Sequence, residues 1–249
     1  MKFVVTAGPT REYLDPVRFL SNPSTGKMGF AVARAAAMRG HEVALVAGPV
    51  SLKTPKGVRR IDVTSAREML AAVEKELFSN SRDMVRYSSG RVGDAPLPVG
   101  AALRADRISQ CSMVFIATAA VADWRPAKCA ARKLKKGQMS DILKLVRNPD
   151  ILKTVARRAK RQAPARASTI FVGFAAETND VIAEARRKCR EKNLDMIVAN
   201  DVTEKGSGFG VDTNRVTFVR KDGSVERLPL MTKLAVARRI VRECEDLHP

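Results

Sequence analysis

Short apolar runs alternate with longer amphipathic stretches along most of the chain. Residues 2–10, KFVVTAGPT, form a β-branched run that ends in Gly8 and Pro9, which predicts a buried strand followed by a turn. The alanine-rich residues 26–39 have the composition of a helix that ends at Gly40. Residues 41–49 predict the next strand, which completes a strand–helix–strand unit.

The same alternation continues toward the C-terminus. Residues 58–63 predict a strand and residues 64–77 a helix, in which Ser65 and Glu68 have the spacing of a capping box. The further elements expected are a strand with its outgoing loop at 113–123, a helix at 148–162, a strand at 169–178, a helix at 179–193 capped by Thr178, a strand at 195–201, a hairpin at 215–230 that reverses at Asp222-Gly223, and a final helix at about 231–245.

This order of elements predicts an α/β fold, a mainly parallel sheet with helices on both faces plus a C-terminal β-hairpin and helix. Ligands of such sheets bind beyond the carboxyl ends of the strands. Residues 79–110 interrupt the alternation with a mixture of Ser, Gly, Pro and Arg, which predicts an exposed insertion or flexible loop. We expect residues 1–249 to form a single domain around it.

Charge narrows the possible partners. The chain has 45 Lys and Arg against 26 Asp and Glu, a formal charge of +19 that favours polyanions or anionic small molecules. One alternative is therefore a basic nucleic-acid-binding protein, whose binding would depend steeply on salt. Against it, one Trp and two Tyr leave few platforms on which bases could stack.

Cysteine and histidine are too sparse for several kinds of chemistry. Cysteines at 111, 129, 189 and 244 have no C-x-x-C spacing, and the two histidines are at 41 and 248, which argues against a zinc site or a histidine-assisted triad. No apolar run approaches the roughly 20 residues that span a bilayer. Since the N-terminus reads as a strand and not as a signal peptide, we expect a reduced, cytoplasmic protein without a membrane anchor.

The stretch SNPSTGKMGF at 21–30 has only part of a phosphate-binding loop. Ser21 stands where a Walker A loop needs glycine, and Met28 stands where it needs a hydroxyl. Small residues followed by Lys27 at a helix N-terminus still suit an anion. A nicotinamide-dependent oxidoreductase is a second alternative, but no G-x-G-x-x-G follows the first strand and no suitably placed acidic residue follows the second.

Three later segments also follow strands and have residues suited to an anionic nucleotide. Residues 118–138 contain Asp123 and then Lys133, Lys135 and Lys136, which either form a solvated basic surface or place one lysine against a triphosphate. Residues 173–180 contain Phe174, a core residue or a stacking partner. Lys188 and Lys192 share a face of the following helix. The glycine-rich residues 200–216 suit either a turn or a hinged flap.

Taken together, the segments resemble phosphopantothenoylcysteine synthetase, the ligase of coenzyme A biosynthesis that often forms the C-terminal half of a bifunctional decarboxylase/synthetase. The strings that carry the resemblance are TAGPTREYLDPVRFLSNPSTGKMG, ATAAVADWRP, the KLKK at 133–136, RNPDIL, GFAAET, KNLDMIVAND and GSGFGVDTN. They occur in family order and cover nearly the whole chain outside 79–110.

The resemblance implies a Rossmann-like, three-layer fold and a homodimer with composite sites. It also implies a magnesium-dependent reaction, in which the carboxylate of 4'-phosphopantothenate attacks the α-phosphate of CTP and cysteine then displaces CMP from the acyl-cytidylate. CTP is expected in preference to ATP, and no metal ligand is assigned. Since no flavin-dependent decarboxylase half is present, a separate protein is expected to supply that step.

The resemblance also implies roles for individual residues. Asn22 would hydrogen-bond the acyl carbonyl or the intermediate, and Lys133 would stabilise charge at the α-phosphate. Phe174 would pack near the base, and Lys188 and Lys192 would reach the triphosphate. The remaining nucleotide contacts would come from Ala117, Thr118, Ala119, Asp123, Pro149, Asp150, Ile151 and Leu152, and the phosphopantothenate side from Ser24, Thr25, Gly26 and Lys27.

Overall fold

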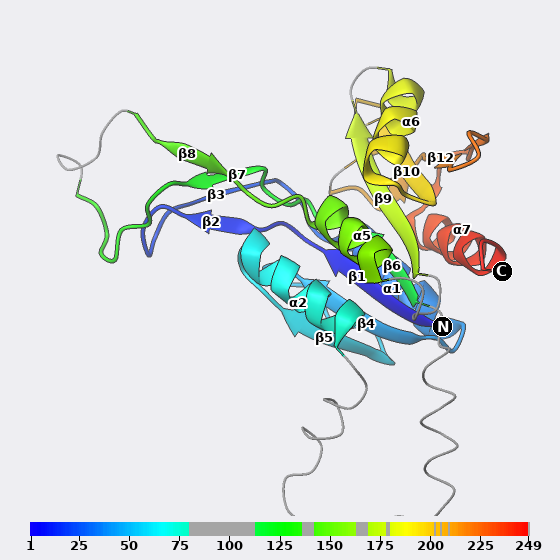
Figure 1. Cartoon of the computed structure of the whole chain (residues 1–249), viewed down its shortest axis with the longest axis horizontal. Helices are drawn as coiled ribbons and strands as arrows, with labels where there is room; N and C mark the ends of the chain where they lie inside the picture. Colours follow the sequence, from blue (N-terminus) through cyan, green and yellow to red (C-terminus); the bar gives the residue numbers. More distant parts are fainter. Residues whose placement is uncertain are drawn as a thin grey trace, which may run out of the picture.

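One eight-stranded sheet organises the chain, in the order β13-β12-β10-β9-β6-β1-β4-β5 (Figure 1). The computed structural model describes residues 1–79, 113–135, 142–162, 169–177, 180–201, 203–204, 206–208 and 210–248. The strands of this sheet are β1 (Lys2–Ala7), β4 (Glu42–Ala47), β5 (Val58–Asp62), β6 (Met113–Ala117), β9 (Thr169–Glu177), β10 (Met196–Asp201), β12 (Thr217–Arg220) and β13 (Val225–Arg227).

Strand β1 lies at the point where the strand order reverses. It pairs in parallel with β4 on one side, Val5 opposite Leu45, and with β6 on the other, Val5 opposite Ile116. After β1 the chain proceeds outward to β4 and β5, returns to β6 and continues through β9 to β10. The loops that leave β1 and β6 lie side by side at the carboxyl edge, before the chain continues to helices on opposite faces. This edge is where open parallel sheets bind ligands.

Helices cover both faces of the sheet, as predicted. Helices α1 (Lys27–Met38) and α7 (Lys233–Asp246) pack on the face that contains Phe3 and Leu45. Helices α2 (Ala66–Phe78), α5 (Ile151–Gln162) and α6 (Val181–Lys192) pack on the face that contains Phe115. Both clusters consist of fully buried aliphatic and aromatic side chains, so the sheet is a hydrophobic layer between two helical layers.

Local signals in the sequence correspond to the ends of these elements. The Ser65 hydroxyl accepts the Glu68 amide at 3.3 Å, which confirms the expected helix start. Gly40, with φ +82°, ends α1. The hairpin β12–β13 reverses at Asp222-Gly223 as expected. Helix α6 begins after Asp180, and Thr178, the cap predicted for it, lies outside the described residues.

An antiparallel arm departs from the predicted pattern. It consists of two strand pairs, β2 (Arg11–Tyr13) with β3 (Phe19–Ser21) and β7 (Trp124–Pro126) with β8 (Leu145–Arg147). In Figure 1 the arm extends to the left, away from the helical layers. Strands of three residues are too short to show an alternating pattern, so they could not be predicted from the sequence. For the same reason, the sequence did not predict a further short antiparallel pair, β11 (Thr213–Asn214) with β14 (Met231–Thr232).

Several expectations fall on segments that the structure does not describe. Apart from Ser79, the predicted insertion at 79–110 lies outside the described residues, as do Cys111 and Lys136. The three described cysteines, Cys129, Cys189 and Cys244, are free thiols. Within the described parts of the chain, no helix combines the length and apolar character that a membrane crossing requires.

The close approach of α1 to β1 and β6 makes Gly29 a sensitive position. A Cβ there would lie 2.4 Å from Thr118 Oγ1 and 2.5 Å from Ala7 Cβ. We expect Gly29→Ala to lower the free energy of unfolding by about 1–3 kcal/mol in urea titrations, because the helix must move away from the sheet. Arg34→Ala at an exposed position of the same helix should stay within about 0.5 kcal/mol of the wild type. Equal stability of the Gly29 variant would contradict this packing.

Candidate active site

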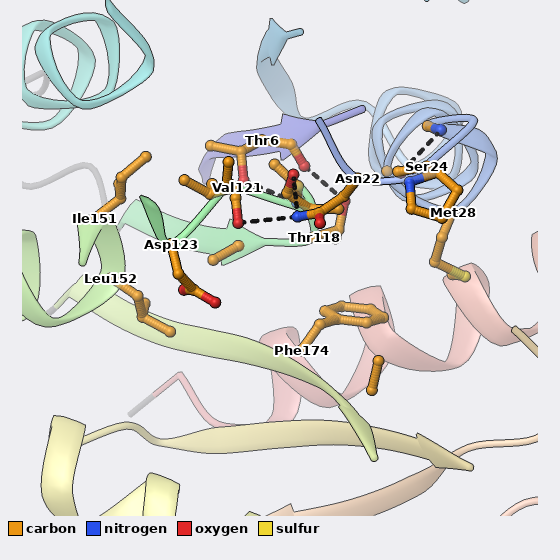
Figure 2. Close-up of a pocket in the computed structure, with 18 of the residues that line it drawn as sticks. Thr6, Asn22, Ser24, Met28, Thr118, Val121, Asp123, Ile151, Leu152 and Phe174 are labelled. Carbon is orange, nitrogen blue, oxygen red and sulfur yellow. Dashed lines mark hydrogen bonds between the residues drawn. The ribbon is translucent and has the colours of Figure 1, made fainter. Parts of the chain in front are cut away.

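A cavity of about 770 Å³ opens at the carboxyl edge of the sheet, between the loops that follow β1 and β6 (Figure 2). Its far wall comes from the start of α5 and from β9, where Phe174 faces the cavity. The residues implied by the resemblance that line it are Asn22, Ser24, Thr25, Gly26, Lys27, Ala117, Thr118, Ala119, Asp123, Pro149, Asp150, Ile151, Leu152, Phe174 and Lys192. Segments far apart in the sequence thus meet where the topology predicts.

Hydrogen bonds fasten the β1 loop to the β6 loop. The Thr118 hydroxyl donates to the Thr6 carbonyl at 2.6 Å, and the Thr6 hydroxyl accepts the Ala119 amide at 3.3 Å. Beyond the strands, the Ala120 amide donates to the Gly8 carbonyl at 2.9 Å, and the Thr10 hydroxyl accepts from Ala122 at 3.0 Å. Small side chains and buried hydroxyls therefore keep the two loops in a fixed relation along one wall of the cavity.

Asn22 lies across these two loops (Figure 2). Its Nδ2 donates to the carbonyl of Ala120 at 3.2 Å and to that of Val121 at 3.1 Å. This orientation of the amide is the favourable one, because the opposite orientation would bring the Asn22 oxygen against two carbonyl oxygens. Both side-chain protons are therefore engaged within the chain, and Asn22 holds the β6 loop at the cavity wall.

The N-terminus of α1 opens into the cavity. Gly26 is the N-cap, with φ +77°, and provides no side-chain cap; the first turn contains no acidic residue. Ser24 and Met28 flank this end of the helix at the cavity (Figure 2). Unpaired amides and the positive end of the helix dipole favour an anion at this place.

Two predicted lysines line the cavity, and each is paired with a carboxylate. Lys27 Nζ lies 2.8 Å from Asp212 Oδ1 and also 2.8 Å from the Gly210 carbonyl, and this contact with Lys27 lowers the pKa of Asp212. Lys192 Nζ lies 2.8 Å from Asp150 Oδ2. Asp150 has a second role, since its Oδ1 accepts the Lys153 amide at the start of α5.

Lys188 and Lys133, also implied by the resemblance, do not line the cavity. Lys188 is on α6, 2.5 Å from Glu177. Lys133 is exposed and lies on the arm, in the segment between β7 and β8. Its neighbour Leu134 is held by hydrogen bonds at both backbone groups, to Asp15 Oδ2 at 3.2 Å and from Arg18 Nη2 at 2.7 Å.

Several cavity residues were not found by sequence reasoning. Trp124 lines the cavity where β7 begins, with the Arg147 guanidinium 5.1 Å from its ring centre. Lys233, almost completely buried, donates to the carbonyls of Gly208 and Val211. Burial lowers the pKa of Lys233, and Lys27 lowers it further while Asp212 opposes the change. The other cavity residues missed are Thr6, Pro23, Met28, Gly29, Ala120, Val121, Ala122, Asn148, Ala176, Asn200, Gly208 and Asn214.

One signal could have found part of this group. Thr6 and Asn200 are polar and buried, and each stands at the end of an apolar run, which is the pattern of a polar group placed at a strand end. Ligand pockets are lined mainly by apolar side chains with a few placed polar groups, so buried polar residues at strand ends are candidates for a pocket wall. Among the described residues no group of three or more His, Cys, Asp and Glu could hold a metal ion.

Comparison with known proteins gives a match over almost the whole chain. A family model described as the DNA/pantothenate metabolism flavoprotein C-terminal domain matches residues 1–93 and 101–247. The coenzyme A biosynthesis bifunctional proteins CoaBC of Vibrio cholerae and Bacillus subtilis are each 44% identical to it, over 242 and 245 residues. These alignments cover 96% and 98% of the chain and 51% of each relative, so the chain spans about half their length.

Solved structures agree with the fold. The crystal structure of a CoaBC C-terminal domain matches with a TM-score of 0.68 and 38% identity, over 99% of this chain and 94% of that one. The DNA/pantothenate metabolism flavoprotein of Streptococcus pneumoniae has a TM-score of 0.68 at 21% identity, over 100% of both chains. At that identity the second likeness shows the shared fold alone. The mainly parallel α/β architecture is thereby confirmed.

Asp15 anchors the segment that carries Lys133, and its charge can be tested by pH. Burial acts to raise the pKa of Asp15, but hydrogen bonds from the Arg18 side chain and from the amides of Val17, Arg18 and Leu134 outweigh it, so the pKa is far below its usual range. A lowered pKa gives stability that is present above the unfolded-state value of about 4 and is lost as pH falls toward the folded-state value.

We therefore expect Asp15→Asn to be less stable than the wild type at neutral pH in urea titrations, with a difference that narrows as the pH falls below about 4. Asp246→Asn, at an exposed position near the C-terminus, is the matched control and should change stability by less than about 0.5 kcal/mol. A difference for Asp15→Asn that stays constant over this pH range would show that its negative charge is not what holds Leu134.

Proposed function

Because the chain belongs to the family described as the DNA/pantothenate metabolism flavoprotein C-terminal domain, we propose that it is a ligase that joins 4'-phosphopantothenate to L-cysteine in coenzyme A biosynthesis. The observation that carries the proposal is the assembly of the family motifs around one cavity: all but two of the residues implied by the resemblance line it. Relatives named for coenzyme A biosynthesis, at 44% identity, support the same pathway.

The proposed reaction has two steps. A carboxylate oxygen of 4'-phosphopantothenate attacks the α-phosphorus of CTP, pyrophosphate leaves, and an acyl-cytidylate remains. The amine of cysteine then attacks the acyl carbon, CMP leaves, and the amine loses a proton as the amide forms. Since the mixed anhydride is itself an activated acyl group, the protein needs to position the reactants and to balance charge. A cavity whose described lining contains no histidine or cysteine suits that requirement.

The cavity provides separate places for the reactants. The open N-terminus of α1, with Ser24, Thr25 and Lys27, suits the anionic phosphopantothenate. The opposite wall, with Phe174, the start of α5 and Lys192, suits the nucleotide. Lys27 and Lys192 must exchange their carboxylate partners for phosphate oxygens, so anion binding is an exchange of ion pairs within the site.

Asn22 has a specific role in this scheme. Its amide protons are donated to the Ala120 and Val121 carbonyls, which places its side chain at the junction of the two loops. To donate to the acyl carbonyl, Asn22 must release one of these bonds. An aspartate at this position would face the same two carbonyl oxygens with a negative charge, so the loop would separate from residue 22.

We propose a homodimer in which the arm completes the site of a second copy. Lys133 is on the arm and does not reach the cavity of its own chain. The arm also exposes large apolar side chains, among them Val17, Phe19 and Leu145. Exposed apolar surface of this kind marks an interface. A second copy that packs there would bring Lys133 to the partner's α-phosphate position.

Magnesium would enter with the nucleotide. Mg²⁺ is commonly held by phosphate oxygens, water and one or two carboxylates, and Asp123 and Asp150 are the carboxylates at the cavity wall. It would neutralise charge on the triphosphate and on the departing pyrophosphate. We propose CTP as the preferred nucleotide, action in the cytoplasm, and a single domain formed by residues 1–249.

The two alternatives have less support. The relatives at 44% identity are named for coenzyme A biosynthesis, which favours the ligase over either alternative. Strands β2 and β3 also stand between β1 and α1, in place of the tight glycine-rich turn that a dinucleotide requires. The net charge still permits weak, salt-sensitive binding of polyanions, which could coexist with the ligase.

Complementation between two inactive variants tests the composite site. We expect Lys133→Gln and Asn22→Asp each to lose most turnover as homodimers, because one removes charge at the α-phosphate and the other disturbs the loop junction. Coexpressed, the two chains should recover up to about a quarter of wild-type turnover, since half of the dimers are mixed and each of these has one intact site. A homodimer in which every chain has both substitutions should show no recovery of turnover.

No recovery in the coexpressed pair, with mixed dimers verified by differently tagged chains, would show that Lys133 and Asn22 act within one subunit. Wild-type turnover of the Lys133→Gln homodimer would remove Lys133 from the mechanism altogether.

A direct assay tests the reaction itself. With 4'-phosphopantothenate, cysteine and Mg²⁺, we expect release of CMP from CTP that requires cysteine, with pyrophosphate formed in equal amount. Pyrophosphate release without cysteine, limited to about one equivalent per site, would mark the acyl-cytidylate step. Cysteine-dependent AMP from ATP in place of CMP would keep the ligase and change the base preference. No product with either nucleotide from the folded dimer would refute the proposed function.

A further inference from the structure

A second cavity, of about 880 Å³, lies beside the first and shares Lys27 and Lys233 with it. We propose that this second cavity binds a small organic anion with an apolar or aromatic body, a site that goes beyond the proposed reaction. Its volume is in the range of pockets that hold small-molecule ligands. The cavity is formed by the outer face of α1, residues 52–56 and the N-terminus of α7.

The interior of the second cavity is apolar on three sides. On α1, Phe30, Ala31 and Met38 follow the helical spacing that places them on one face. Leu52 faces them from the segment between β4 and β5, and Leu234 from the first turn of α7. Met38 is 58% exposed although it lies beside these apolar neighbours, so its side chain is available to a ligand.

The rim of the second cavity is strongly basic. Arg34, Lys53 and Lys56 line it and are exposed, and within the described part of the chain none of them has an ion-pair partner. Among the described lining residues Asp212 is the one carboxylate, and Lys27 already pairs with it at 2.8 Å. The surplus of positive charge around an apolar interior is complementary to an anionic head on an apolar body.

Contacts within the chain keep the wall of the second cavity in place. The Arg60 guanidinium donates to the Leu52 carbonyl at 2.7 Å and to the Val50 carbonyl at 3.3 Å. It also lies 5.4 Å from the ring centre of Phe30, and its Nε contacts Asp62 at 2.6 Å. One guanidinium thus connects the Leu52 segment to α1. A wall held in this way needs little ordering when a ligand binds, which favours affinity.

The shared lysines connect the second cavity to the first. Lys233 holds the carbonyls of Gly208 and Val211, and Lys27 holds Asp212 and the Gly210 carbonyl, so both lysines determine how residues 208 and 210–212 lie between the cavities. An anion in the second cavity would attract Lys27 and compete with Asp212 for it. Any such change in affinity at one cavity must appear equally at the other.

The test uses anilinonaphthalene sulfonate as the probe, an aromatic anion whose emission rises in apolar surroundings. We expect saturable binding to the folded full chain, weakened at least about tenfold in Arg34→Glu/Lys56→Glu, because both changes reverse rim charge. The matched control is Arg157→Glu/Lys160→Glu, an equal charge change at two exposed positions of α5, which should leave the affinity within about twofold.

A further variant tests the contribution of the apolar interior of the second cavity independently of its basic rim. Met38→Glu, at an exposed position, should also weaken binding of the probe at least about tenfold, because it places a charge in the apolar interior. Thermal unfolding should show that all variants remain folded. Absence of saturable binding to the wild type would overturn the proposal, and so would equal weakening in the cavity and control variants. None of these measurements needs turnover, so their failure is distinguishable from failure of the proposed ligase reaction.

Discussion

The parallel pairing of β1 with β6 determines where the rest of the site lies. Because the chain leaves β1 toward one face and enters β6 from the other, their outgoing loops meet side by side, and the hydroxyls of Thr6, Thr10 and Thr118 hold them together. Every other part of the cavity is placed against this pair of loops: Asn22 crosses it, α1 starts from it, and α5 faces it. The short side chains of this region, such as Gly29, are a requirement of that close approach.

Two lysines of the first cavity are paired with carboxylates of the chain that a bound polyanion can replace. Lys27 and Lys192 are each held by an internal carboxylate, and the two contacts join different elements. Asp150 is shared further, because it also caps α5. Cations that are already paired stay oriented without the cost of a buried, uncompensated charge, and a polyanion can replace the carboxylates because it provides more negative charge in the same place. The large net charge of the chain is consistent with such exchange.

The sequence predicted the sheet, its helices and most of the cavity because these depend on local signals. Apolar runs predicted the strands, and Ser65 and Gly40 predicted helix ends. The position of a segment directly after a strand predicted the loops that form the cavity. It missed the arm, since strands of three residues have no readable period, and therefore could not place Lys133 apart from the cavity. Lys233 was missed because nothing in its neighbours distinguishes a buried lysine from a solvated one.

Trp124 is the only tryptophan in the chain, and it lines the cavity where β7 begins. Trp124 is 44% exposed and has the Arg147 guanidinium over its ring, so a bound nucleotide or acyl group would change both its solvation and its cationic neighbour. Tryptophan fluorescence of this protein consequently comes from one indole at one place. A change in the fluorescence of Trp124 can therefore report binding in the cavity without an added label.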